Sequence, residues 1–364
     1  MTDETVWSLD PHTLGKHKVL RGYLDAWLPI MASWSGRVLF IDGFAGPGEY
    51  KNGEPGSPLI AISALKEHTA KSNIRAEVGF IIIEKDTDRA NHLEKLTKPL
   101  SHRLPGESWI SIHHGTFDET MTEVLDQVDK QAAKLAPSFV MVDPFGVSGT
   151  PMTVIARIMR NESAEVYISF QYEAINRFAT TPEFEQHLDD LFGTATWRDA
   201  LEIQDPEARK AFYYKLYEDQ LRNAGAKQVL EFELFEGNRL VYAIFYGTQH
   251  ELGSDRMKKA IWDVAPWGDF QFRAPEGGQL SLGIEEADLN PLMVQIEEEF
   301  RGRGWVTIEE VTSFVQSDRT IYHSGHLKRG TLVPMEKTNR VEVDETSRKR
   351  NNTYPGGTLL RIVE

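Results

Sequence analysis

The chain has 364 residues, 55 acidic against 40 basic side chains, a net charge of −15, and no cysteine. The lack of cysteine excludes disulfides, thiolate metal sites and an iron–sulfur cluster held by this chain. No run approaches the roughly 18–20 apolar residues of a membrane span, and residues 1–11 lack the basic and apolar regions of a signal peptide. We therefore expect a cytoplasmic protein without a membrane contact.

The charge is spread unevenly along the chain. Residues 301–364 hold 11 lysines and arginines against 8 acidic residues, a net charge of +3, whereas residues 1–300 carry −18. An acidic body disfavours indiscriminate binding to nucleic acid, so contacts with phosphates are expected in the C-terminal part.

Residues 15–31 predict a helix with one apolar face, because large apolar side chains recur there at helical spacing. Pro29 should kink or end this helix. Two interpretations are open. The helix either docks on a sheet, or its residues Lys16, His17 and Tyr23 lie over a bound ligand as a lid.

The chain is organised around residues 38–48, which read VLFIDGFAGPG. An apolar run that favours a buried strand stops at Asp42, and a glycine-rich turn follows. Open α/β sheets bind small molecules at such strand ends. The order Asp-x-Phe-x-Gly-x-Gly differs from the G-x-G-x-x-G of dinucleotide folds, and the next helix start is delayed to Ser57 and Pro58.

A ligand with an amino-acid end and a sulfonium suits this turn better than a pyrophosphate, which needs a helix N-terminus directly after the glycines. We therefore expect S-adenosylmethionine as the cofactor. The residues of the turn predicted to bind it are Asp42, Gly43, Phe44, Ala45, Gly46, Pro47 and Gly48.

Two further strands are predicted at residues 78–84 and 109–115. The first ends in Glu84, which is placed to accept hydrogen bonds from ribose hydroxyls; the alternative is a solvated acid at a strand end. Thr116 and Asp118 follow the second strand, where an adenine edge would lie. His113 and His114 are adjacent in a strand and face opposite sides of the sheet, so no metal site is expected.

The candidate catalytic residues follow a fourth predicted strand, at residues 138–146. Asp143 and the carbonyl of Pro144 would accept a hydrogen bond from an amine or hydroxyl, and Phe145 would stack on a flat substrate. The alternative interpretation is a simple Asp-Pro turn at a strand end.

A fifth strand is predicted at residues 165–170, and a hairpin at residues 228–235 and 240–248 around the turn 236–239. A final antiparallel hairpin is typical of the methyltransferase variant of the doubly wound sheet. The predicted fold class is therefore α/β, with a Rossmann-like methyltransferase sheet. Residues 181–223 read as mostly helical, and their aromatic stripe reads as core.

Residues 270–286 are glycine-rich and predict a linker, which places a methyltransferase-like domain at 1–286 and a second domain at 287–364. The second domain shows three helical segments, at 290–300, 308–315 and 323–338, and a two-stranded hairpin. This pattern predicts a winged helix. The predicted phosphate contacts are Lys328, Arg329, Arg348, Lys349 and Arg350; the alternative is a winged helix that binds protein.

The sequence resembles the three-Cys-motif partner family. The resemblance rests on KHKVLRGYLDAW (16–27), FIDGFAGPGEY with GEPGSPL (40–59), IIIEKD (81–86), VDPFG (142–146), INRF (175–178) and NTYPGGTLLRIV (352–363). It implies a methyltransferase-like fold and a genomic partner that is a radical-SAM-like protein with three cysteines. Residues 143–146 are also similar to the Asp-Pro-Pro-aromatic motif of enzymes that methylate exocyclic amines, but Phe145 and Gly146 depart from it.

These observations lead to an S-adenosylmethionine-dependent methyltransferase, a transferase acting on a DNA or RNA base. The alternative is a non-catalytic, cofactor-binding or substrate-delivering partner of the radical-SAM-like protein. A nicotinamide-dependent oxidoreductase is disfavoured by the delayed helix and by the terminal hairpin.

Overall fold

The computed structural model describes residues 5–69, 71, 74–266, 271–273 and 287–363. Within these ranges the chain forms two compact units. Unit 1 takes in residues 5–249 and 271–273, and unit 2 takes in residues 250–266 and 287–363. In this described part, no helix combines the length and the apolar character that crossing a bilayer requires.

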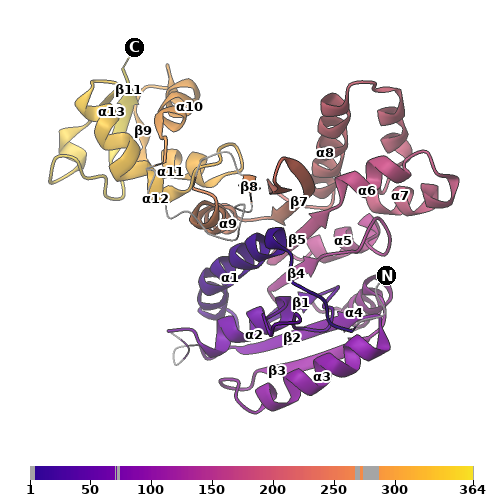
Figure 1. Ribbon diagram of the computed structural model, residues 1–364. Helices are drawn as coiled ribbons and strands as arrows, with labels where there is room; N and C mark the ends of the chain where they lie inside the picture. Colours follow the sequence, from indigo (N-terminus) through magenta and orange to yellow (C-terminus); the bar gives the residue numbers. More distant parts are fainter. Residues whose placement is uncertain (1–4, 70, 72–73, 267–270, 274–286, 364) are drawn as a thin grey trace. The chain divides into compact units, whose positions relative to one another are not determined.

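Unit 1 is built on a sheet that has eight strands in the described residues, in the order β3-β2-β1-β4-β5-β7-β6-β8 (Figure 1). Strands β1 to β5 run parallel, and β7 lies antiparallel between β5 and β6. The predicted α/β architecture and its antiparallel hairpin are confirmed. The strands are β1 (Arg37–Asp42), β2 (Glu77–Glu84), β3 (Trp109–His114), β4 (Ser138–Val142), β5 (Ala164–Phe170), β6 (Gln228–Glu236), β7 (Arg239–Thr248) and β8 (Gln271–Arg273).

Helices cover both faces of this sheet. They are α1 (Pro11–Ala32), α2 (Ser57–Lys66), α3 (Thr87–Ser101), α4 (Phe117–Lys130), α5 (Met152–Met159), α6 (Tyr172–Phe178), α7 (Glu185–Phe192) and α8 (Pro206–Asn223), with 3-10 turns η2 (Pro182–Phe184) and η3 (Ala195–Glu202). Helix α1 ends at Ala32, three residues after Pro29, which was expected to kink or end it. Pro29 lies in the last turn, where its missing amide removes a single hydrogen bond.

The core lies on the two faces of the parallel strands, because side chains alternate along each strand and both faces are covered. On one face, Phe40 of β1 stacks on Phe139 of β4, with ring centroids 6.0 Å apart, and α1 packs Tyr23 and Trp27 against Phe139. The opposite face gathers the buried side chains of α4, α5 and α8, including the aromatic stripe of α8. That stripe is core, as predicted.

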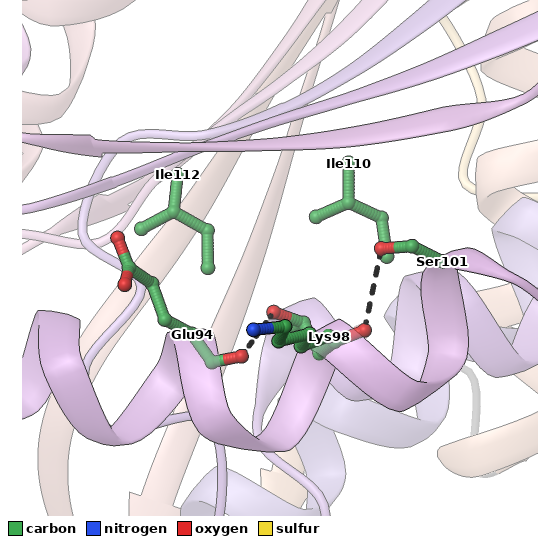
Figure 2. A pocket seen from close by; sticks show the side chains of 6 residues that line it. Glu94, Lys98, Ser101, Ile110 and Ile112 are labelled. Atoms are coloured by element: carbon green, nitrogen blue, oxygen red, sulfur yellow. Dashed lines mark hydrogen bonds between the residues drawn. The ribbon is translucent and has the colours of Figure 1, made fainter.

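The edge strand β3 is covered by α3. Figure 2 shows the shallow hollow between them, with Ile110 and Ile112 projecting from the strand toward Glu94, Lys98 and Ser101 of the helix. Ile110 and Ile112 are alternate residues and share one face of β3, so α3 packs on that face of the strand. We take this hollow as packing at the sheet edge.

Unit 2 combines helices with a small antiparallel sheet of order β10-β11-β9. Its elements are α9 (Glu251–Val264), α10 (Asn290–Phe300), β9 (Val306–Thr307), α11 (Ile308–Gln316), α12 (Ser324–His326), the π-helix η4 (Leu327–Leu332), α13 (Val333–Lys337), β10 (Val341–Val343), the 3-10 turn η5 (Glu345–Ser347) and β11 (Leu359–Ile362). Thr307 and Glu310 form a complete capping box at α11.

The predicted domain boundary differs from the observed division, because α9 belongs to unit 2. The Lys258 ammonium donates to the carbonyls of Val315 (2.5 Å) and Ser317 (2.6 Å), at the C-terminal end of α11. The Asp255 carboxylate accepts the Ser324 amide at 2.6 Å. A boundary at residue 286 would separate these partners. The predicted linker, 270–286, lies outside the described residues except for β8.

Candidate active site

The glycine turn after β1 needs glycine for two physical reasons. Gly46 and Gly48 have φ of +62° and +87°, a region that other residues rarely adopt. A Cβ on Gly48 would also lie 2.5 Å from a methyl of Leu93 in α3, and one on Gly43 would lie 2.4 Å from the Phe117 ring. The turn is therefore packed tightly on its inner side.

Glu84, predicted to bind ribose, fastens this turn to the end of β2. One oxygen of its buried carboxylate accepts the Gly46 amide at 2.7 Å, and the other accepts the Asp86 amide at 2.8 Å. Each carboxylate oxygen has a second lone pair. The ribose role stays a prediction, and the structure adds a supporting role in the turn.

The loop after the turn folds back on it. The Gly56 amide donates to the Gly48 carbonyl at 2.7 Å, and a Cβ on Gly56 would lie 2.9 Å from that oxygen. Helix α2 begins directly afterwards at Ser57. The delayed helix expected from the sequence is confirmed, and its N-terminus does not follow the glycines directly.

Asp143 at the end of β4 forms an ion pair with Lys16 of α1, 127 residues earlier in the chain. The Lys16 side chain is only 4% exposed, and that of Asp143 is 25% exposed. Burial alone would raise the pKa of Asp143, but the Lys16 ammonium outweighs it and holds that pKa below its usual range. Asp143 is a carboxylate at neutral pH.

Asp42 at the end of β1 has the opposite property. Burial raises the pKa of its carboxyl group to about 7, and the Phe44 amide, which donates to Oδ1 at 3.2 Å, opposes only part of that effect. Strands β1 and β4 are neighbours (Figure 1). Two acids therefore lie at adjacent strand ends, one ionised and the other close to half-protonated at neutral pH.

A small pocket, partly open to solvent, lies in front of the turn. Its walls come from residues 44–50, residues 56–57, Trp7, His17, Asp143 and Phe145. The structure thus brings most of the predicted cofactor turn together with two of the three predicted catalytic residues. Asp42, Gly43 and Glu84 support this turn without lining the pocket.

Three of the predicted site residues are placed differently. Thr116 caps α4 and donates to Glu119, and Asp118 lies in the first turn of that helix. Neither lines the pocket. Pro144 is buried, and its carbonyl accepts the Gln171 side-chain amide at 3.4 Å. Phe145, by contrast, is 76% exposed at the pocket rim.

The sequence analysis missed Trp7 and Tyr50. The Trp7 carbonyl accepts the Lys51 amide at 2.9 Å, and its indole lies edge-on to Tyr50 and Phe145, with centroids 6.3 and 6.0 Å away. No pattern in the chain links these aromatic residues, which meet only in the fold. Lys16 did carry a signal, because it occupies a position on the apolar face of its helix, where a lysine needs an acidic partner.

His17 lies beside Lys16 in the pocket wall, with its ring 5.8 Å from that of Tyr50. Burial lowers its pKa to about 3, and the Lys16 charge adds to this effect. His17 is therefore a neutral imidazole. Of the three residues in the lid interpretation, His17 lines the pocket, Lys16 is buried against Asp143, and Tyr23 is part of the core.

In unit 2, the predicted phosphate contact Arg348 is wrong. Its side chain is 1% exposed and is bound to Glu336 and Glu345, with the Tyr354 hydroxyl on the same Glu336. A guanidinium held by two carboxylates inside the fold is not available to a phosphate. Lys328, Arg329, Lys349 and Arg350 are exposed, and the Lys328 ammonium donates to the Tyr354 carbonyl at 2.6 Å.

Fold and site together define a class of architecture. In the described residues, unit 1 is an α/β unit whose mostly parallel sheet changes direction of winding between β1 and β4. Ligands of open α/β sheets bind outside the carboxyl ends of the strands at this point. The pocket lies there, at the ends of β1 and β4.

No protein-family model matches the chain, and no curated protein matches its sequence. Solved structures do match. A Legionella pneumophila protein of family DUF519 shares 13% identity with a TM-score of 0.36, over 64% of this chain and 85% of that one. An O-methyltransferase from Bacillus cereus in complex with SAH shares 11% (TM-score 0.33; 63% and 80%). A human methyltransferase 10 domain containing protein shares 13% (TM-score 0.30; 64% and 83%). Similarity this low assigns no activity.

Proposed function

We propose that the chain is an S-adenosylmethionine-dependent methyltransferase. The observation that carries the proposal is the charge around the glycine turn. Asp42, Glu84 and Asp143 lie around it. Lys16 neutralises Asp143, and among the described residues no lysine or arginine forms an ion pair with Asp42 or Glu84. A cationic sulfonium is favoured beside Asp42 and Glu84, whereas a pyrophosphate would meet like charge.

The strand order supports the same proposal. Dinucleotide folds of the order 3-2-1-4-5-6 continue with parallel strands, whereas here β7 lies antiparallel between β5 and β6. The residues that would hold the cofactor are the backbone of residues 44–48, with Glu84 at the ribose and Asp42 behind the turn. When bound, the cofactor supplies a methyl group that its sulfonium already activates.

The remaining chemistry is positioning of the acceptor atom. The Asp143 carboxylate accepts a hydrogen bond from the nucleophile, and the exposed ring of Phe145 packs on a flat substrate. Holding donor and acceptor in line contributes most of the rate enhancement that such a site can give. We propose a nucleic-acid base as this substrate. A base in a duplex must first leave the stack, which costs a few kcal/mol.

Unit 2 is proposed to be a winged helix that binds the nucleic acid. Support comes from its element order, with three helical segments, a small antiparallel sheet and a hairpin tip between β10 and β11. The exposed Lys349 and Arg350 lie at that tip. The net positive charge of residues 301–364 adds to this support.

Calorimetry tests the cofactor first. We expect wild type to bind S-adenosylmethionine and not NAD, and Gly46→Val to lose the binding, because valine is strained at positive φ and its side chain meets the Trp7 ring. Gly36→Ala, with open space around the new methyl group, is the control that should bind normally. Binding of NAD alone would contradict the proposal. Methylated oligonucleotides would then be sought by mass spectrometry.

The proposed nucleic-acid surface is tested with two kinds of substitution in unit 2: one removes exposed basic side chains, and the other removes a buried one. The double substitution Lys349→Ala and Arg350→Ala should weaken binding to a DNA duplex, and should lower the slope of log affinity against log salt by about 2, since each phosphate contact adds about 1. The unfolding temperature should not change. Arg348→Ala should instead destabilise unit 2, by about 3 kcal/mol, because it leaves the Glu336 carboxylate inside the fold without its cationic partner. An unchanged salt slope would refute these two contacts.

A second candidate function is a non-catalytic partner that binds the cofactor or delivers substrate to a radical-SAM-like protein with three cysteines. The Lys16–Asp143 pair favours it, because the proposed acceptor carboxylate is already engaged. Cofactor binding without methyl transfer to DNA, RNA or protein would select this candidate. Methyl transfer that is lost in Asp143→Ala, with cofactor binding retained, would exclude it.

A further inference from the structure

The Trp7 indole covers the glycine turn on the side from which a ligand would approach it. A Cβ added to Gly46 would lie 3.5 Å from Cη2 and 3.8 Å from Cζ2 of this ring. Glycine leaves that side of the backbone free for a ligand, and here a side chain of the protein itself covers it. Because the added Cβ would already be in van der Waals contact, only a group the size of a methyl fits between the indole and Gly46.

Three elements around the turn hold the indole. The Tyr50 ring lies edge-on to it with centroids 6.3 Å apart, and the Phe145 ring with centroids 6.0 Å apart. The Arg89 guanidinium, in the first turn of α3, lies 4.8 Å from the centre of the indole, as a cation–π contact. Trp7 therefore lies between the loop after β1, the end of β4 and the start of α3.

The space that remains in the pocket is too small for the proposed cofactor. Its volume is about 40 Å³, which holds about three water molecules at roughly 10–15 Å³ each. Sites that enclose drug-sized organic ligands have volumes of roughly 300–1,000 Å³. Trp7 is the largest side chain that lines the pocket. A cofactor can lie along the turn only if the indole moves away.

The segment that carries Trp7 can move without disturbing the sheet. Residues 5–10 belong to no helix or strand. The Lys51 amide, in the loop after β1, donates to the Trp7 carbonyl at 2.9 Å. Moving residues 5–10 breaks this hydrogen bond and the ring contacts, but no pairing between strands. The cost of opening is therefore a few weak contacts.

We propose that residues 5–10 form an autoinhibitory strap, whose Trp7 indole occupies part of the cofactor site and competes with S-adenosylmethionine for the face of Gly46. This inference rests on the proposed function and adds a means of regulating it. In the closed form the indole covers the turn, and in the open form the strap leaves and the cofactor lies there. The closed fraction lowers the apparent affinity for the cofactor. A ligand that holds the strap away from the turn raises that affinity.

Calorimetry on the full-length protein with S-adenosylhomocysteine tests the competition. Trp7→Ala should bind about 10-fold more tightly than wild type, which corresponds to about nine wild-type molecules in ten in the closed form. The matched control is Trp34→Ala, at a tryptophan that is 58% exposed and precedes β1, whereas the pocket follows β1. It should bind as wild type does. Equal or weaker binding by Trp7→Ala would overturn the inference, since the indole would then be a bystander or a wall of the cofactor site.

A second measurement follows the strap in the wild-type chain. The protein is labelled with fluorotryptophan, and the ¹⁹F resonance absent from Trp7→Phe identifies Trp7. Addition of S-adenosylhomocysteine should move this resonance to the position of a tryptophan in water, whereas a resonance that keeps its buried position would contradict the strap. Binding by Trp7→Ala alone would support the inference. If neither wild type nor Trp7→Ala binds S-adenosylhomocysteine, the proposed cofactor itself is wrong, and the inference fails with it.

Discussion

At the ends of β1 and β4, two aspartates of the same intrinsic chemistry differ because of one neighbour. Asp143 has the Lys16 ammonium beside it, whereas Asp42 is fully buried behind the glycine turn and has a pKa of about 7. Carboxyl groups whose environments separate their pKa values are a common arrangement at acid–base sites. Around neutral pH, the charge of Asp42 behind the turn therefore changes with pH, whereas Asp143 stays ionised.

The pKa of Asp42 predicts that binding of the cofactor is coupled to release of a proton. A cation placed at the turn favours the ionised form of Asp42, so binding of S-adenosylmethionine near pH 6.5 should release a fraction of a proton. Calorimetry in buffers of different ionisation enthalpy measures that fraction. In Asp42→Asn the release should vanish, and in wild type it should vanish at pH 9, where Asp42 is already ionised. Heats that do not depend on the buffer at pH 6.5 would contradict this prediction.

The raised pKa of Asp42 also determines how the stability of the folded protein changes with pH. The pKa of Asp42 in the folded protein is raised above its unfolded value. The folded state therefore binds more protons between pH 4 and 7, and the stabilisation present below pH 4 is lost as the pH rises through 7. Asp42→Asn should flatten that part of the stability curve.

Individual residues were predictable where the chemistry is local. The turn residues 42–48 and the strand-end acids Glu84 and Asp143 follow from short patterns. The Lys16 partner, the burial of Arg348 and the aromatic contacts of Trp7 depend on residues far apart in the chain. A pattern within one segment carries no information about which distant segment it meets.

Among the elements, the loop between β1 and α2 makes the sharpest prediction. Gly56→Ala should push a methyl group against the Gly48 carbonyl, 2.9 Å away, and so open the turn from its outer side. We expect a loss of about 1–3 kcal/mol in the free energy of unfolding, together with weaker cofactor binding. Urea denaturation and calorimetry measure the two effects.

Gly36→Ala is the matched control for this loop, because nothing lies within 4 Å of the added methyl group. It should leave both the stability and the binding within about 0.5 kcal/mol of wild type. Equal effects at Gly36 and Gly56 would show that the contact with the Gly48 carbonyl does not matter.

Strands and their connections were predicted better than helix ends. The β6–β7 hairpin follows from its Glu-Gly-Asn-Arg turn, and the parallel strands follow from their apolar runs. The helix expected over residues 15–31 begins earlier, at Pro11, and ends at Ala32. Residues 254–264 (SDRMKKAIWDV) have an amphipathic pattern that predicts a helix, and α9 covers them, but such a pattern does not say which unit the apolar face will join.

At the scale of the whole molecule, the division into units predicts which fragments fold. A fragment of residues 250–364 contains α9 and its partners, whereas residues 287–364 contain the partners without α9. Without α9, the three carbonyls bound by Lys258 lose their donor, and Trp262 no longer covers Tyr322, on which it stacks at 5.5 Å. We expect the longer fragment to unfold cooperatively on heating.

The shorter fragment should melt at least 10 °C lower or remain unfolded, since a small unit shifts by about 4–8 °C for each kcal/mol lost. Circular dichroism and proton–nitrogen NMR spectra compare the two fragments. Identical melting curves would show that α9 adds nothing to unit 2, and would restore the boundary at residue 286.

The order of the elements along the chain has a consequence for synthesis on the ribosome. Helix α9 precedes β8 of unit 1, and its own partners in α11 and the segment up to His326 come later. At about 5–20 residues per second, α9 waits on the order of 3–12 s for these partners. During this interval Met257, Ile261 and Trp262, all buried in the finished fold, face water. A nascent chain halted before residue 287 would therefore display an uncovered apolar helix, a form that holding chaperones bind.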